Sequence, residues 1–238
     1  MRRAILAAAI AGALSTGCAD DPETVTRTAE QRGEALFRDP RVSPNSFNPF
    51  ACATCHAAGP VPAGQRLPGG SLAGVTRRTS FWGGQERDLR SSIDVCLSAF
   101  QSDAVGLDPQ EDRAIALYAY LASLPGDGTS VPFTIVPTIV DLPNGDPTRG
   151  AAVWDAACRS CHGDPHTARG QLAGLSIVVP EDTIAEHVPK GDDVRLIVIE
   201  KVRHGSFLGY SGRMPPFSLE TLSDAELADV LSYLGLDR

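Results

Sequence analysis

Apolar positions along the chain fall into two sets that follow the same order. Gly33-Glu34-Ala35-Leu36-Phe37 parallels Gly150-Ala151-Ala152-Val153-Trp154, and each run places a glycine four residues before an aromatic, on one face of a helix. Apolar residues recur at helical spacing over Glu111–Leu124 and again over Asp224–Leu236. The pattern therefore predicts a mainly helical chain with an internal repeat, each copy opening and closing with a helix.

The boundaries of the predicted segments follow from local composition and from residues that break helices. Ser223 and Glu226 form a capping-box signal at the start of the last predicted helix. Prolines rule out a helix between the two copies, and Val131–Val140 is rich in β-formers, so this segment is expected to be extended against one copy. The expected segments are a signal peptide over 1–17, a polar tether over 18–28, a first domain over 29–125, a Pro-rich linker over 126–146 and a second domain over 147–238.

The two copies differ by an insertion. Trp154 lies four residues before Cys158, whereas Phe37 lies fifteen residues before Cys52. The first copy therefore carries about eleven extra residues around Pro40–Phe50, which either shield a bound group or form part of an interface.

Two C-x-x-C-H runs carry the chemistry: Cys52-Ala53-Thr54-Cys55-His56 and Cys158-Arg159-Ser160-Cys161-His162. Two cysteines at this spacing can each add to one vinyl group of a haem, and the adjacent histidine can bind the iron. A zinc site or a redox disulfide is the alternative for a single run. With both runs in one chain, the sequence resembles the diheme c-type cytochromes. That resemblance implies two class I cytochrome c domains in tandem, each around a covalently bound haem, with His56 and His162 as iron ligands.

Composition agrees with this interpretation. The 238 residues are 42% hydrophobic. The 23 glycines and 18 prolines indicate long loops that wrap around a bound group. A formal charge of −8 argues against nucleic acid as a partner. It suits a neutral or basic redox partner instead.

The N-terminus predicts export. Two arginines precede the apolar run Ala4–Leu14, which is too short to span a bilayer and has the layout of a secretory signal. Leu14-Ser15-Thr16-Gly17-Cys18 resembles the lipobox of bacterial lipoproteins, with Leu14 one place further from Cys18 than usual. The resemblance implies a lipid anchor on Cys18 and, because Ala19 follows, the periplasmic face of the outer membrane. A plain cleaved signal and a soluble periplasmic protein are the alternative.

The distal ligand of the second haem is predicted to be Met214. It lies 52 residues after His162, in Arg213-Met214-Pro215-Pro216-Phe217, just before the last predicted helix. A methionine before proline resembles the distal loop of class I cytochromes, and Met/His ligation raises the haem potential. The alternative is that Met214 is a core residue and that His204 or His166 binds the iron.

For the first haem, few ligands remain. Between 24 and 125 His56 is the only histidine, and there is no methionine or lysine. One cysteine is left, Cys96, 40 residues after His56. Either Cys96 binds as a thiolate, which a metal favours by deprotonating the thiol, or it is a buried apolar residue and the iron is open or bound from elsewhere.

A cysteine ligand to the first haem makes the family resemblance more specific. Ile93-Asp94-Val95-Cys96, Leu72-Ala73-Gly74-Val75 and Arg77-Arg78 look like the first domains of thiosulfate dehydrogenases and of the haem subunit of the Sox sulfur-oxidation system, over about 33–125. In those families a ligating cysteine follows an Ile-x-x-Cys pattern before the last helix of the first domain. Beyond Cys96 the chain departs from them at Ser98–Asp103, which bears on substrate binding rather than on ligation.

Three functions remain open at this point. The preferred one is a periplasm-facing diheme electron carrier between unidentified redox proteins, because it needs only the haems. The second is oxidation of small sulfur anions with Cys96 as the catalytic residue, for which guanidinium groups would bind the anion. The arginines considered for this role lie between the first C-x-x-C-H run and Cys96, and each is more simply a propionate partner or a solvated residue: Arg77, Arg78, Arg87 and Arg90. The third is a redox or gas sensor whose thiolate leaves the iron.

Overall fold

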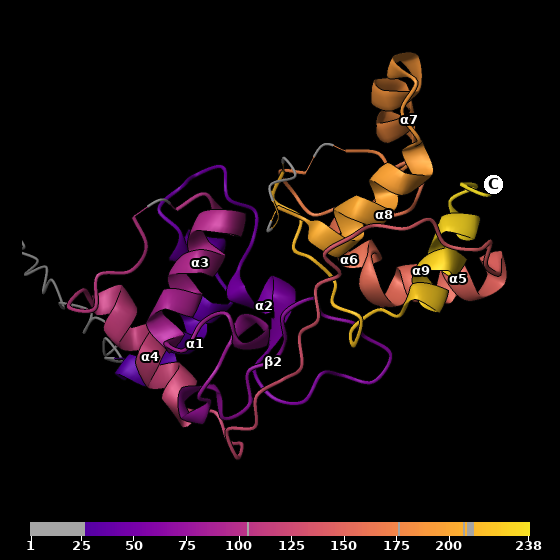
Figure 1. The fold of residues 1–238 in the computed structure, drawn as a ribbon. Helices are drawn as coiled ribbons and strands as arrows, with labels where there is room; N and C mark the ends of the chain where they lie inside the picture. Colours follow the sequence, from indigo (N-terminus) through magenta and orange to yellow (C-terminus); the bar gives the residue numbers. More distant parts are fainter. Residues whose placement is uncertain (1–26, 104, 176, 207, 209–211) are drawn as a thin grey trace, which may run out of the picture.

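A computed structural model describes residues 27–103, 105–175, 177–206, 208 and 212–238. The predicted signal peptide, Cys18 and most of the tether lie outside these residues. The described chain is mainly helical (Figure 1). Within it, no helix combines the length and apolarity needed to cross a membrane.

The elements in chain order are α1 (Ala29–Phe37), η1 (Pro40–Val42), α2 (Cys52–Cys55), β1 (His56–Ala57), β2 (Gly70–Ser71), η2 (Val75–Arg77), η3 (Trp82–Gly84), α3 (Leu89–Gln101), α4 (Asp112–Ser123), α5 (Pro147–Ala157), α6 (Arg159–His162), α7 (Glu181–His187), η4 (Val188–Lys190), α8 (Val194–His204) and α9 (Asp224–Tyr233).

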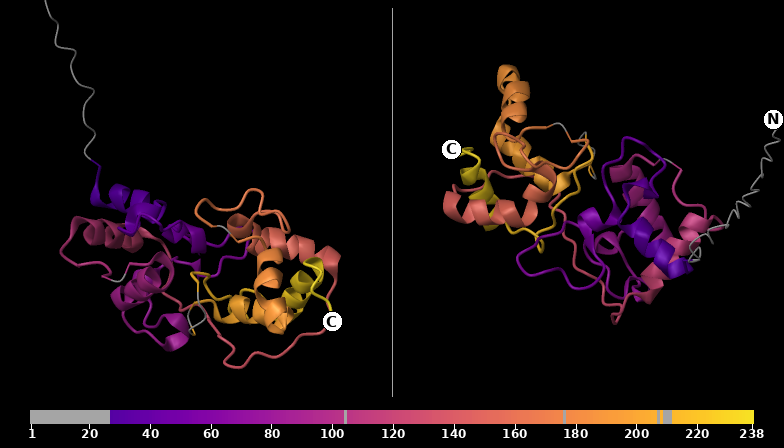
Figure 2. Two further views of the ribbon diagram at one scale, coloured as in Figure 1. Left: turned by 90° about the horizontal axis from the view of Figure 1, so that it is seen from above. Right: turned by 180° about the vertical axis from the view of Figure 1, so that it is seen from behind.

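Helices of residues 29–125 and of residues 147–238 gather in two groups that lie side by side in all three views (Figures 1 and 2). We call them the first half and the second half. Each half has its own buried apolar cluster. The first cluster centres on Phe37, Leu97, Leu117 and Leu121, and the second on Trp154, Leu227, Leu231 and Phe217.

In the first half, α1 packs on α4 at Gly33. A Cβ at this position would lie 2.0 Å from the carbonyl oxygen of Ala116, so only glycine allows the two backbones to approach this closely. Phe37 then packs on Tyr120 with ring centroids 5.4 Å apart. The closing helix α4 is confirmed within one residue at each end, and Glu111 is its N-cap.

The second half repeats this packing with α5 on α9. A Cβ at Gly150 would lie 2.0 Å from the carbonyl oxygen of Asp229. The predicted capping box is confirmed, because the Ser223 side chain accepts from the Glu226 N–H and Glu226 accepts from the Ser223 N–H. Helix α9 ends three residues earlier than predicted, because Gly235 adopts a left-handed backbone with φ +71°.

The linker over 126–146, all of which the structure describes, contains no helix or strand. It lies against the second half as well as the first. Thr134 donates its N–H and its hydroxyl to the Glu220 carboxylate at 2.9 and 2.6 Å. His204 donates its Nε2 proton to the Val136 carbonyl at 2.6 Å. The linker is therefore a strap held at several points rather than a loose connection.

Candidate functional site

The first half encloses a cavity of about 1080 Å³, counting its space open to solvent. Its walls are mainly aliphatic and aromatic, and they come from α2, β1, α3 and α4 with the strap. Three of the predicted site residues line it: Cys52, His56 and Cys96.

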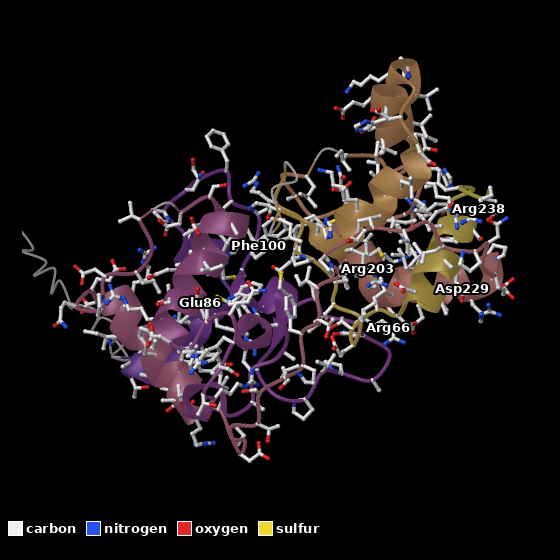
Figure 3. All side chains as sticks on the ribbon, viewed as in Figure 1. Arg66, Glu86, Phe100, Arg203, Asp229 and Arg238 are labelled. Carbon is white, nitrogen blue, oxygen red and sulfur yellow. The ribbon has the colours of Figure 1, made fainter. Side chains whose placement is uncertain are left out.

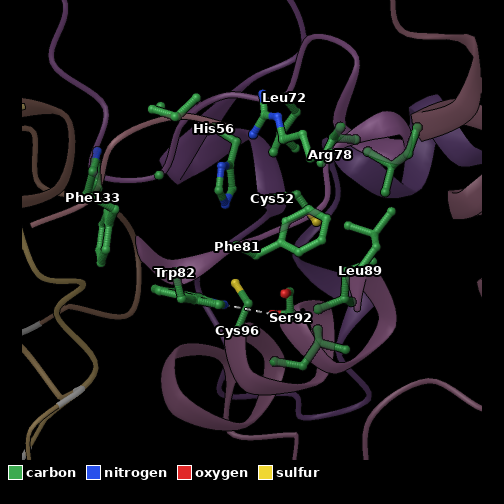
Figure 4. A pocket seen from close by; sticks show the side chains of 18 of the residues that line it. Cys52, His56, Leu72, Arg78, Phe81, Trp82, Leu89, Ser92, Cys96 and Phe133 are labelled. Atoms are coloured by element: carbon green, nitrogen blue, oxygen red, sulfur yellow. Dashed lines mark hydrogen bonds between the residues drawn. The ribbon is translucent and has the colours of Figure 1, made fainter. Parts of the chain in front are cut away.

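His56 and Cys96 point toward one another from opposite walls of this cavity (Figure 4). His56 is at the start of β1, and Cys96 is in the middle of α3. The two side chains are 40 residues apart in sequence, and the fold places an imidazole and a thiol on either side of one space. An iron ligand pair requires this type of arrangement.

The local backbone holds the His56 ring tightly. β1 and β2 pair in parallel with His56 opposite Gly70, and the Gly69 N–H donates to the Cys55 carbonyl at 2.9 Å. A Cβ at Gly69 would lie 2.2 Å from the Cε1 atom of His56, so the glycine lets the backbone pass along the ring. Burial lowers the pKa of His56 to about 4, which keeps the imidazole neutral and able to bind a metal. Its Nδ1 is buried without a hydrogen-bond partner.

Helix α3 brings Cys96 to the cavity. The Asp88 carboxylate caps the helix by accepting from the Ser91 N–H at 2.9 Å. Leu89, Ser92 and Cys96 then follow at helical spacing and line the same cavity wall. Burial raises the pKa of the Cys96 thiol to about 12, so without a metal the thiol stays protonated at neutral pH.

Two aromatic residues that the sequence pattern did not single out complete the wall on the side of the strap. Trp82 packs edge-on against Phe133 of the strap, with ring centroids 5.5 Å apart, and against Phe100 at 6.0 Å. Trp82 has a left-handed φ of +51°, and a Cβ at Gly83 would lie 2.4 Å from the Phe133 carbonyl oxygen. The only sequence signal for this contact is the Gly-Gly pair after Trp82.

Among Arg77, Arg78, Arg87 and Arg90, the residue that lines the first cavity is Arg78. Its NH2 group donates to the carbonyls of Ser71 and Ala73 at 2.8 and 3.0 Å, while its Nε is buried without a hydrogen-bond partner. Arg77 donates instead to the carbonyl of Gly126, at the start of the strap. A single guanidinium, partly committed to backbone carbonyls, is therefore the only arginine charge that faces the first cavity within the described residues.

A second, smaller cavity of about 460 Å³ lies where the two halves meet. The second half contributes the predicted haem residues Cys158, Cys161, His162 and Met214 to its lining. Trp154 holds the turn after the motif by donating its indole N–H to the Gly163 carbonyl at 2.9 Å. Burial raises the pKa of Cys158 to about 12, and burial also lowers the pKa of His162.

The two alternative ligands for the second iron are engaged elsewhere. His204 is buried and bonded through Nε2 to the strap, as described above. His166 is 2.6 Å from the Glu181 carboxylate through Nδ1, and its side chain is 49% exposed. Neither lines the second cavity, whereas Met214 does.

The first half supplies the other wall of the second cavity. Phe50, Thr54, Cys55 and Arg66 belong to that wall, so Cys55 lies nearer the second motif than the sequence indicated. The insertion around Pro40–Phe50 is part of this interface, because the Arg213 guanidinium donates to the Phe47 carbonyl at 2.9 Å.

The donor set fits haem better than a bare metal ion. Among the residues that the structure describes, no group of three or more His, Cys, Asp or Glu is arranged to hold a metal ion. The five cysteines of this part of the chain are all free thiols. Each C-x-x-C-H run instead offers thiols and one imidazole beside a largely apolar cavity, which is what covalent attachment of a haem requires.

Comparison with known proteins supports the cytochrome interpretation for the second half. Residues 145–234 match the family model described as cytochrome C oxidase, cbb3-type, subunit III. These residues are therefore similar to a cytochrome c domain, a type of domain that binds haem covalently.

A solved structure, the as-isolated form of thiosulfate dehydrogenase (TsdBA) from Marichromatium purpuratum, is similar at 19% identity and a TM-score of 0.40. The alignment covers 87% of this chain, which spans about 45% of the length of that protein's chain. No curated protein matches this chain.

Proposed function

We propose that this chain is a diheme c-type cytochrome, with two class I domains over 29–125 and 147–238, that transfers electrons between redox proteins. The observation that carries the proposal is the pair of cavities, each beside one C-x-x-C-H run. The match of the second half to a cytochrome c family supports the second haem directly. The first haem is supported by the placement of Cys52, His56 and Cys96 around one cavity.

Each bound haem would store one electron at its iron. The residues of the chain would set the potentials at which this happens. His56 and Cys96 would hold the first iron, and the negative thiolate stabilises its oxidised form. His162 and Met214 would hold the second iron, and the neutral thioether favours its reduced form. Haem ligands and their surroundings tune potentials over a range of about 0.8 V, so these ligand pairs would give the first haem a lower potential than the second.

Oxidation of small sulfur anions is the second candidate. The Cys96 thiol faces a cavity with solvent-open space, where a small molecule could approach it. The walls argue for the carrier, however, because they are mainly apolar and, among the described residues, Arg78 is the only arginine that lines them. A dianion such as thiosulfate needs several charge-assisted donors to leave water.

For the location, we propose the periplasmic face of the outer membrane, with a lipid on Cys18. The basis is the sequence pattern alone. A Cys18→Ser variant should move from the membrane fraction to the soluble periplasm. Recovery of the wild-type chain in the soluble fraction would instead favour a plain cleaved signal.

The decisive experiment starts from the protein expressed with a c-type cytochrome maturation system. Two haems per chain, counted as pyridine haemochrome against protein mass, are expected. Loss of one haem should follow from Cys52→Ser with Cys55→Ser, and loss of the other from Cys158→Ser with Cys161→Ser. One haem in the wild type would refute the diheme proposal.

The ligand assignment is tested by redox titration of Cys96→Ala and Cys96→Met. Both variants should raise the potential of one haem and leave the other unchanged, because a thiolate charge is removed. Unchanged potentials and spectra in both variants would exclude Cys96 as a ligand. Addition of thiosulfate should leave the oxidised wild-type spectrum unchanged, and rapid reduction of both haems would favour the enzyme.

A further inference from the structure

The two haem-attachment motifs meet at one cavity. Thr54 and Cys55 of the first motif and Cys158 and Cys161 of the second line the same 460 Å³ space. Cys55 therefore lies beside the second motif. Groups attached to the two motifs would be neighbours across this wall.

Arg66 joins the halves at this wall. It lies on the loop between β1 and β2, which extends from the first half toward α5 and α9 (Figures 1 and 3). Its backbone N–H donates to the Ala156 carbonyl at 2.9 Å, two residues before Cys158. Its guanidinium donates to the Thr221 carbonyl at 3.4 Å and forms an ion pair with Glu226. One residue of the first half thus contacts α5, which leads into the second motif, and α9, which packs against α5.

The carboxylate of Glu226, which pairs with Arg66, is held in place by other hydrogen bonds. One oxygen of Glu226 accepts from the backbone N–H and the hydroxyl of Ser223, each at 2.9 Å, as part of the α9 capping box. The other oxygen faces Arg66. The two side chains are 38% and 26% exposed, so the pair is screened less than a fully exposed one. Arg66 is also the only arginine or lysine among the described residues that line the shared cavity.

We propose that Arg66 is a positioning residue for electron exchange between the two haems, because it fixes the separation of the two attachment motifs. The inference rests on the proposed diheme function. The exchange moves one electron: one iron goes from ferrous to ferric as the other goes from ferric to ferrous. No bond or proton is transferred in this step.

The test uses the full holoprotein and the variants Arg66→Ala, Arg66→Lys and Glu226→Gln. Glutamine also fits a capping box, so Glu226→Gln removes the ion pair and keeps the helix cap. Arg38→Ala is the matched control, because it breaks an Arg–Glu pair that lies at the end of α1 and involves only the first half. A flash-activated donor supplies each variant with less than one electron per chain on average. The redistribution of the electron between the two haems is then followed by optical absorption.

Slower redistribution is expected in Arg66→Ala and Glu226→Gln, with partial recovery in Arg66→Lys and the wild-type rate in Arg38→Ala. Haem content, ligand spectra and melting temperature of Glu226→Gln should stay close to wild type, which separates positioning from a folding defect. A wild-type rate in both Arg66→Ala and Glu226→Gln, with two haems bound, would overturn the inference. A wild-type protein with one haem would refute the proposed function instead.

Discussion

Gly150→Ala tests the helix crossing that supports the second motif. The new Cβ would lie 2.0 Å from the Asp229 carbonyl oxygen and 2.7 Å from the Tyr233 Cβ. A carbon rarely approaches a carbonyl oxygen closer than about 3.3 Å, so α5 and α9 would have to separate by roughly 1.3 Å. That shift would also disturb the Arg149–Asp229 pair, whose contacts are 2.8 and 2.9 Å.

Two effects oppose each other in this variant. Overpacking of a close contact costs about 1–3 kcal/mol, and the upper end applies because the obstacle is backbone. Alanine in place of glycine inside a helix stabilises by about 1 kcal/mol. The expected result is a net loss of about 2 kcal/mol in the free energy of unfolding of the second half. Gly33→Ala should behave alike in the first half, since its Cβ would also lie 2.0 Å from a carbonyl oxygen.

The assay is guanidinium unfolding of the holoprotein. Helix content is followed by circular dichroism, and loss of the haem environments is followed by visible absorption. The midpoint should fall while the m-value stays unchanged. Gly59→Ala is the matched control, because a Cβ there meets nothing within 4 Å. Gly150→Ala with stability equal to or above wild type would refute the close-approach argument, because helix propensity would then outweigh the contact.

Two other predictions concern the strap. Phe133→Ala should open the first cavity beside Trp82. Cyanide should then bind the first haem faster than in wild type, as measured by stopped flow. An equal binding rate would mean that the strap does not limit access to the cavity. Hydrogen bonds from Thr134 lower the pKa of Glu220 to about 2 from a usual value near 4.5. The resulting stabilisation is present above pH 4.5 and is lost as pH falls toward 2. Urea midpoints measured across that range should therefore depend less on pH in Glu220→Gln than in wild type, and parallel profiles would contradict this.

Local features of the sequence were enough to predict the helices that frame each half. Gly33 and Gly150 with their aromatic partners, the closing helices and the capping box at Ser223 all appear at or near the expected residues. These features depend on spacings of three or four residues, which a helix converts directly into contacts. The place of His56 and Cys96 on one cavity was also expected, because the first half offers few other ligands.

The sequence by itself determined the chemistry of this protein: two C-x-x-C-H runs, one spare cysteine and one late methionine. Only the tertiary structure decided how these groups are combined. It placed Cys55 in the wall of the second cavity, brought Phe133 of the strap against Trp82, and paired Arg66 with Glu226, 160 residues later. Such contacts depend on how two separately formed cores meet. Residue type and periodicity do not encode that meeting, because apolar burial has no preferred partner and a surface arginine can pair with many carboxylates.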